Sequence, residues 1–273
     1  MNNKLAQLQE HLSHFEKVII GHRGASGLAP ENTFGSFKIA CELGCPLIEL
    51  DVHRIKHDNN SHKLAVIHDH RLDRTTNSKG KVSQISSADL PEIVTEDGSS
   101  LPLLSQVISL IEKEIELAKK VIGLNIELKG DNTGLLAAKY IKTMEMVPTL
   151  ISSFKLKELR AFRTADKHTP IAPLFHRWEH SAIEIADELN ATAINCSVKI
   201  VSAERVGLIK KSGFKVFVYT VNSLRRAEEL FNMGVDGIFT DYPNRMKNWL
   251  KTPKGATLNY ESLIEERNFE KNK

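Results

Sequence analysis

Residues 47–53, LIELDVH, place two carboxylates two positions apart within an apolar run. Successive side chains of a β-strand point to opposite faces, so Glu49, Asp51 and His53 share one face of this segment. Two unpaired carboxylates on a buried face cost free energy, and a cation bound between them removes that cost. The segment therefore predicts a buried strand that carries part of a cation site.

Two further polar motifs follow short apolar runs on either side of this strand. The run 18–20 leads into Gly-His-Arg-Gly at residues 21–24, and the run 64–67 leads into His68. The intervening segment 56–62 is polar and rich in turn-forming residues. This pattern predicts a small hairpin inserted after the second strand.

The rest of the chain alternates apolar runs with amphipathic helical patterns. The expected strands are residues 18–20, 47–53, 121–129, 150–154, 171–175, 193–196, 215–221 and 237–240. The expected helices are residues 30–44, 87–93, 103–120, 133–145, 156–164, 181–189, 203–211, 224–231 and 243–250. Eight strands that alternate with helices predict a TIM (β/α)₈ barrel. A doubly wound open sheet is the alternative fold, but the glycines of the first loop lack the dinucleotide-binding spacing.

We expect this barrel to form a single catalytic domain over residues 1–273, with its core at about residues 18–250. A polar helix at 1–17 and a polar tail at 251–273 flank the core. The carboxyl ends of TIM-barrel strands form the active-site face. The polar residues at these strand ends are therefore expected to converge at one mouth: His22, Glu49, Asp51 and Glu127.

The composition is that of an ordinary water-soluble protein, with 41% hydrophobic and 26% charged residues. The net charge of +3 is too small to indicate a nucleic-acid partner. No apolar run approaches the ~20 residues of a membrane span, and the amino terminus lacks a signal-peptide pattern. We therefore expect a cytoplasmic protein without stable membrane insertion. Its three cysteines, Cys41, Cys45 and Cys196, are expected to be buried free thiols.

Five residues of the expected mouth suit a phosphate held beside a metal ion. The carboxylates of Glu49, Asp51 and Glu127 are oxygen ligands of the kind that a hard divalent cation, Mg²⁺ or Ca²⁺, prefers. Arg23 can offer a bidentate fork to phosphate oxygens, and Lys129 a point charge.

His22 and His68 supply the two proton-transfer groups that phosphodiester cleavage needs. One group deprotonates the nucleophile, and the other protonates the leaving alkoxide. Histidine suits both tasks near neutral pH. The residues leave open which histidine is the acid, and whether water or a hydroxyl of the substrate is the nucleophile.

Four motifs occur in a fixed order along the chain: HRGASGLAPENT at 22–33, ELDV at 49–52, IHDHRLDRTT at 67–76 and NIELK at 125–129. Their order and spacing resemble the glycerophosphodiester phosphodiesterase family, as do the later segments ISSF, VYTVN and GVDGIFTDYP. The resemblance implies hydrolysis of diesters such as glycerophosphocholine or glycerophosphoethanolamine to an alcohol and sn-glycerol 3-phosphate. It also implies site roles: His22 and His68 catalytic, Arg23 and Lys129 phosphate-binding, Glu49, Asp51 and Glu127 metal-binding, and Glu31 close to the site.

Three departures from the family pattern affect the fit to substrate rather than the chemistry. His70 stands where an acidic residue is common, Tyr219 replaces a tryptophan, and residues 101–105 read LPLLS instead of Pro-Thr-Leu-Glu. Tyr219 is expected to pack against the glycerol of the substrate. The alternatives are a lysophospholipase D that uses the same site and a catalytically silent phosphate-binding barrel.

Several residues near these motifs have supporting roles in this interpretation. Asp69 is expected to orient a neighbouring histidine or cap a loop rather than bind metal, and Arg71 and Arg74 to fix the loop after His68 by ion pairing. His176 is a weaker candidate for lining the pocket. His53, one step further along its strand than Asp51, is expected to lie outside the metal-binding group.

Overall fold

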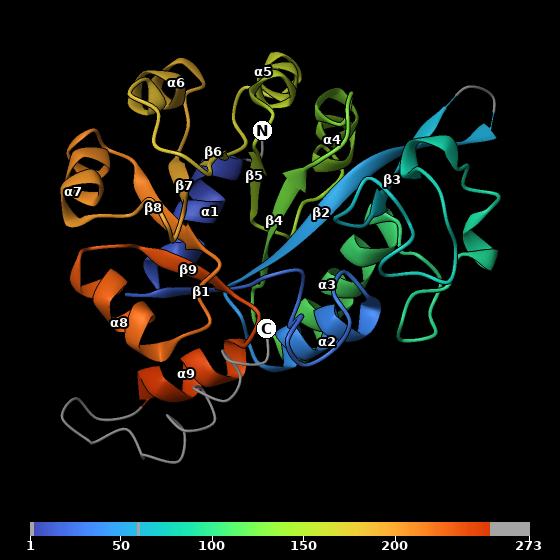
Figure 1. Cartoon of the computed structure of the whole chain (residues 1–273), viewed down its shortest axis with the longest axis horizontal. Coiled ribbons are helices and arrows are strands. Elements are labelled where there is room, and N and C mark those ends of the chain that lie inside the picture. Colours follow the sequence, from blue (N-terminus) through green and yellow to red (C-terminus); the bar gives the residue numbers. More distant parts are fainter. Residues whose placement is uncertain (1–2, 59–60, 252–273) are drawn as a thin grey trace.

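The computed structural model describes residues 3–58 and 61–251 and shows a closed barrel of parallel strands ringed by helices (Figure 1). The barrel strands are β1 (Val18–Gly21), β2 (Leu47–Lys56), β4 (Gly123–Leu128), β5 (Thr149–Ser153), β6 (Ile171–Phe175), β7 (Ala193–Ser197), β8 (Lys215–Tyr219) and β9 (Gly237–Thr240). Each strand pairs in parallel with the next in this series, and β1 pairs with both β2 and β9, which closes the sheet. The predicted (β/α)₈ barrel is confirmed.

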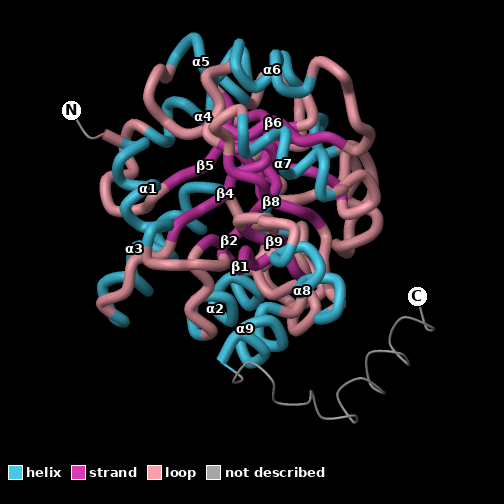
Figure 2. The backbone as a smooth tube through the Cα atoms, turned by 90° about the vertical axis from the view of Figure 1, so that its left-hand side faces the viewer, coloured by secondary structure: helices cyan, strands magenta, loops and turns pink. Residues whose placement is uncertain are grey.

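Helices cover the outside of the barrel, and Figure 2 shows them surrounding the strands. They are α2 (Phe34–Glu42), α3 (Leu104–Ala118), α4 (Gly134–Ile141), α5 (Leu156–Ala165), α6 (Ala182–Glu188), α7 (Ala203–Lys211), α8 (Leu224–Asn232) and α9 (Pro243–Lys251). Among the described helices, none is long and apolar enough to cross a bilayer. The three cysteines are buried free thiols, as predicted.

The interior of the barrel changes from apolar to charged along its axis. Helix α1 (Lys4–Ser13) contributes Leu8 and Leu12 to an apolar cluster that also contains Leu47 of β2. Because side chains alternate along a strand, Glu49 and Asp51 point into the barrel on the same side as Leu47. The strand β2 thus runs from the apolar floor, which α1 covers, to an acidic mouth.

The predicted hairpin is confirmed, because β2 continues beyond the barrel and pairs antiparallel with β3 (His62–Val66). The helix predicted at 87–93 is wrong: this segment forms only a 3₁₀ turn at Leu90–Glu92. Pro91 has no N–H to donate inside a helix. The backbone of Lys56 also bonds to the carbonyl of Ile85 (3.1 Å) and the N–H of Ser87 (2.9 Å), which holds this segment extended beside β2.

A buried carboxylate holds the start of α4 in place. Glu158 of α5 is 4% exposed and accepts hydrogen bonds from the backbone N–H groups of Asn132 and Gly134, both at 2.9 Å. We expect Glu158→Ala to lower the free energy of unfolding by about 1–3 kcal/mol, because two buried donors lose their acceptor. Urea unfolding followed by circular dichroism measures this change.

A matched control is Glu188→Ala, which removes a surface carboxylate paired with Arg160. Exposed ion pairs contribute at most about 1 kcal/mol, so this variant should unfold close to the wild-type midpoint. Equal midpoints for the two variants would contradict the assigned role of Glu158.

Candidate active site

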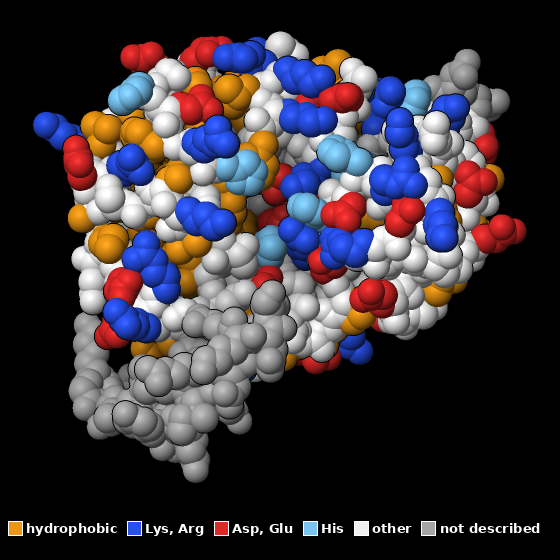
Figure 3. Space-filling model, in the orientation of Figure 1, with side chains coloured by type: hydrophobic (Ala, Val, Ile, Leu, Met, Phe, Trp, Pro, Cys, Tyr) orange, Lys and Arg blue, Asp and Glu red, His pale blue; other side chains and the backbone are white. Residues whose placement is uncertain are grey.

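A cavity of about 570 Å³ opens at the carboxyl ends of the barrel strands. Figure 3 shows it as a hollow near the centre of the face, with histidine, lysine and arginine side chains around it. Seven of the predicted site residues line this cavity, namely His22, Arg23, Glu49, His68, Glu127, Lys129 and Tyr219. The eighth, Asp51, is 1% exposed and lies in one acidic group with Glu49 and Glu127.

The acidic group joins two neighbouring strands. Glu49 and Asp51 lie on β2, and Glu127 of β4 is the register partner of Asp51. One carboxylate oxygen from each residue lies within 4.8 Å of the others. Glu49 Oε1 and Asp51 Oδ1 are buried without a hydrogen-bond partner among the described residues. Two such orphaned oxygens within a group of three convergent carboxylates fit a hard divalent cation.

Burial and mutual repulsion oppose the ionisation of the three carboxylates in this group. Burial, together with the charges of Asp51 and Glu127, raises the pKa of Glu49 well above its ordinary value. Burial and Asp51 raise the pKa of Glu127 to about 7. Burial opposes ionisation of Asp51 as well, but Lys129 and Arg23 lower its pKa to about 2. A bound cation would relieve the repulsion that raises the first two values.

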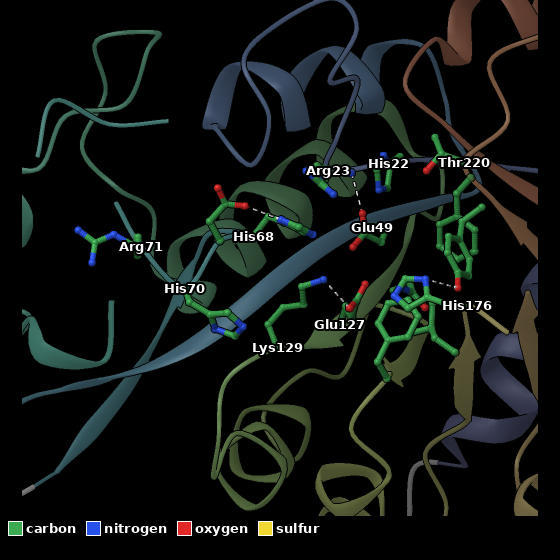
Figure 4. A pocket seen from close by; sticks show the side chains of 16 residues that line it. His22, Arg23, Glu49, His68, His70, Arg71, Glu127, Lys129, His176 and Thr220 are labelled. Atoms are coloured by element: carbon green, nitrogen blue, oxygen red, sulfur yellow. Dashed lines mark hydrogen bonds and ion pairs between the residues drawn. The ribbon is translucent and has the colours of Figure 1, made fainter. Parts of the chain in front are cut away.

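Two cationic side chains border the acidic group, as Figure 4 shows. Lys129 Nζ lies 2.8 Å from Glu127 Oε1 and 3.5 Å from Asp51 Oδ1. Arg23 Nε lies 3.4 Å from Asp51 Oδ2, and its Nη1 donates to Glu31 Oε1 at 2.9 Å. These positions place a guanidinium and an ammonium where they can contact an anion at the metal-binding group.

Backbone geometry holds Arg23 and a further polar residue in place. Arg23 has φ of 52°, in the left-handed region, and its backbone N–H donates to Glu49 Oε2 at 2.7 Å. Asn32, with φ of 58°, donates from Nδ2 to Asp51 Oδ2 at 2.9 Å. Sequence reasoning missed this contact of Asn32. The sequence signal that could have indicated it is an asparagine, a residue that tolerates the left-handed backbone conformation, directly before the helix cap at Thr33.

Each predicted catalytic histidine is paired with a carboxylate through Nδ1. His68 Nδ1 lies 2.7 Å from Asp69 Oδ1, and His22 Nδ1 lies 2.6 Å from Asp241 Oδ1. A carboxylate on Nδ1 fixes the neutral tautomer in which Nε2 is free to accept a proton. Burial, the largest influence, lowers the pKa of His68.

Asp241 was missed by sequence reasoning. It follows β9, which pairs with β1 so that Thr240 is the register partner of Gly21. The closure of the barrel therefore brings Asp241 next to His22. Burial of Asp241 opposes ionisation, but the bond from His22 lowers its pKa overall. The sequence signal that could have identified Asp241 is its position directly after the last predicted strand, at residues 237–240.

The supporting residues lie where they were expected. The ion pairs around the loop after His68 are confirmed, since Arg74 contacts Asp69 (2.7 Å) and Glu31 (2.7 Å), and Arg71 contacts Asp73 (3.1 Å). His53 is buried, lies 3.1 Å from the carbonyl oxygen of His68 and does not contribute to the acidic group.

An aromatic wall, formed by Phe154, His176 and Tyr219, lines part of the cavity. His176 stacks on Phe154 with ring centroids 3.8 Å apart, and Tyr219 meets Phe154 edge-on at 5.7 Å. Tyr219 Oη donates to the carbonyl of Phe175 at 2.8 Å, which fixes the phenol. Lys129 Nζ lies 5.6 Å from the centre of the Phe154 ring, so the wall adjoins the cationic part of the site.

The sequence profile of the glycerophosphoryl diester phosphodiesterase family matches residues 22–245. The chain belongs to this family. A glycerophosphodiester phosphodiesterase of Caldanaerobacter subterraneus is 32% identical over 252 residues, which cover 86% of this chain and 98% of the relative. The human lysophospholipase D GDPD1 is 22% identical over 282 residues, which cover 89% of this chain and 88% of the relative.

Among solved structures, an Oleispira antarctica phosphodiesterase in complex with the product sn-glycerol-3-phosphate is similar to this chain. The TM-score is 0.78 at 25% identity, over 88% of this chain and 99% of that one. The comparisons confirm the predicted family and enzyme class.

Proposed function

We propose that this phosphodiesterase hydrolyses small glycerophosphodiesters, such as glycerophosphocholine and glycerophosphoethanolamine, to an alcohol and sn-glycerol 3-phosphate. The observation that carries the proposal is the buried acidic group, with its two orphaned oxygens, between two histidine–carboxylate pairs. The solved relative that holds sn-glycerol-3-phosphate supports the choice of product.

Glu49, Asp51 and Glu127 would hold a divalent cation, Mg²⁺ or Ca²⁺, which neutralises charge on the phosphate when bound. Arg23 and Lys129 bind the phosphate oxygens from the two sides of the acidic group. The aromatic wall, including Tyr219, packs against the carbon chain of the glycerol.

His22 and His68 carry out the proton transfers. One imidazole accepts the proton of the attacking hydroxyl or water at Nε2, and the other donates a proton to the oxygen of the leaving alcohol. Asp241 and Asp69 keep the two rings oriented and stabilise whichever ring carries the positive charge.

We also propose a cytoplasmic location, which the three free, buried cysteines support. The whole chain would act as one catalytic domain on a small-molecule substrate.

The test is an assay of purified protein with glycerophosphocholine, glycerophosphoethanolamine and lysophosphatidylcholine, in the presence of Mg²⁺ or Ca²⁺. Release of sn-glycerol 3-phosphate from the two soluble diesters is the expected result. Preferential cleavage of lysophosphatidylcholine would favour a lysophospholipase D instead. No turnover of any of the three would indicate a silent phosphate-binding barrel.

The orientation of His22 by Asp241 gives a further prediction. Asp241→Asn should lower kcat by roughly 10-fold or more, because part of the 10²–10⁴-fold acid–base contribution depends on the correct tautomer. Steady-state assays of glycerophosphocholine hydrolysis measure this loss.

The control for this variant is Ser26→Ala, which removes only the hydroxyl that donates to Asp241 at 2.8 Å. It leaves the histidine–carboxylate bond in place and should keep the wild-type kcat. An unchanged kcat in Asp241→Asn would show that Asp241 does not position His22.

A further inference from the structure

A second pocket of about 580 Å³ lies beside the catalytic cavity. Its described lining includes five basic side chains, Arg54, Lys56, Arg71, Lys81 and Lys155, and one carboxylate, Asp131. Figure 3 shows lysine and arginine side chains gathered between the central hollow and the end of the β2–β3 hairpin. We refer to this site as the basic pocket.

Three of the five basic side chains of the basic pocket lack an ion-pair partner among the described residues, while Arg71 pairs with Asp73 at 3.1 Å. Asp131 is already held by Lys155 and Lys157, each at 2.9 Å, so it does not neutralise the other lining residues. Among the ion pairs formed by residues 3–58 and 61–251, none involves Arg54, Lys56 or Lys81. Several like charges gathered without partners repel each other, and an anion bound among them relieves that repulsion.

The basic pocket adjoins the catalytic cavity. His70 and Arg71 line both spaces. In Figure 4 these two residues lie on the His68 side of the cavity, away from His176 and Thr220. A substrate whose glycerol packs against the aromatic wall would therefore extend its alcohol group past His68 towards the basic pocket.

The strand β2 sets the distance between the two sites. Asp51 belongs to the acidic group, and Arg54 lies three residues further along the same strand, which is about 10 Å at the rise of an extended chain. The loop after β4 runs alongside: a Cβ on Gly130 would lie 3.3 Å from the backbone nitrogen of Arg54. The backbone at Gly130 therefore packs closely against β2 at His53 and Arg54.

We propose that the basic pocket binds a phosphate carried by the alcohol part of the substrate, so that the enzyme prefers diesters whose alcohol bears a second phosphate. This inference rests on the proposed phosphodiesterase function and adds a substrate preference to it. Arg54, Lys81 and Lys56 contact the second phosphate, and His70 and Arg71 form the passage that leads to it.

The test compares glycerophosphoglycerol with its terminally phosphorylated form, two diesters that differ only in the second phosphate. Substrate loss is followed by anion-exchange chromatography. The wild-type enzyme should show a higher kcat/KM for the phosphorylated diester, and 0.5 M NaCl should reduce that preference because salt screens exposed charges. The double variant Arg54→Gln/Lys81→Gln should lose roughly 10-fold in kcat/KM on the phosphorylated diester and stay within about twofold of wild type on glycerophosphoglycerol.

A matched control is Lys113→Gln/Lys211→Gln, which removes the same charge from exposed positions on α3 and α7. Its kcat/KM should equal that of the wild type on both substrates. Equal losses in the two double variants, or no loss in Arg54→Gln/Lys81→Gln, would overturn the assignment of the basic pocket. Absence of turnover of both diesters by the wild type would instead contradict the proposed function, so the two failures are distinguishable.

Discussion

His22→Ala and His68→Ala are each expected to lower kcat for glycerophosphocholine by about 10²–10⁴-fold, the usual contribution of one acid–base group. Both imidazoles line the catalytic cavity, and each is held by a carboxylate on Nδ1. Both side chains are partly exposed, 17% for His22 and 30% for His68, so both variants should fold. Steady-state kinetics, together with circular dichroism of each variant, separate loss of turnover from loss of structure.

His168→Ala is the control for these two variants. His168 is exposed and lies outside the residues that line the catalytic cavity. Its replacement should leave kcat unchanged. Near-full activity in both His22→Ala and His68→Ala would contradict the assignment of the acid–base pair.

Removal of divalent cations is expected to lower kcat by a factor of about 10³ or more. A Lewis-acidic cation contributes several kcal/mol to charge stabilisation in the transition state, and each 1.36 kcal/mol corresponds to tenfold in rate. The same removal should destabilise the fold, since three convergent buried carboxylates then repel each other. At a cation concentration of 100 times Kd, binding adds about 2.7 kcal/mol to stability, which differential scanning calorimetry detects as a higher Tm.

Most of the fold could be predicted because its signals are local. Alternation of short apolar runs with helical patterns identified the eight strands, and the period of two along β2 placed Glu49 and Asp51 on one face. Parallel pairing of β2 with β4 then brought Glu127 beside Asp51. The predicted helix at 87–93 failed because Pro91 and the edge of β2 outweighed local propensity.

The unpredicted parts of the site depend on contacts between segments that are distant in sequence. Asp241 reaches His22 only when β9 closes the barrel against β1. Asn32 reaches Asp51 because its backbone adopts a left-handed conformation in the first loop. Lys81 and Arg54 line one pocket because the long segment after β3 folds back beside β2. The sequence of this segment has no strong periodic pattern, so its course could not be predicted.

We propose that the carboxylates of Glu49, Asp51 and Glu127 hold a catalytic cation between the two histidines. The most direct measurement is sn-glycerol 3-phosphate release from glycerophosphocholine by EDTA-treated enzyme during a titration with Mg²⁺ or Ca²⁺, with Tm recorded at each point. We predict that activity and Tm rise together with added cation in the wild type, and that neither rises over the same concentrations in Asp51→Asn. Full activity of the wild type in excess EDTA, or the same cation response in Asp51→Asn, would contradict the claim.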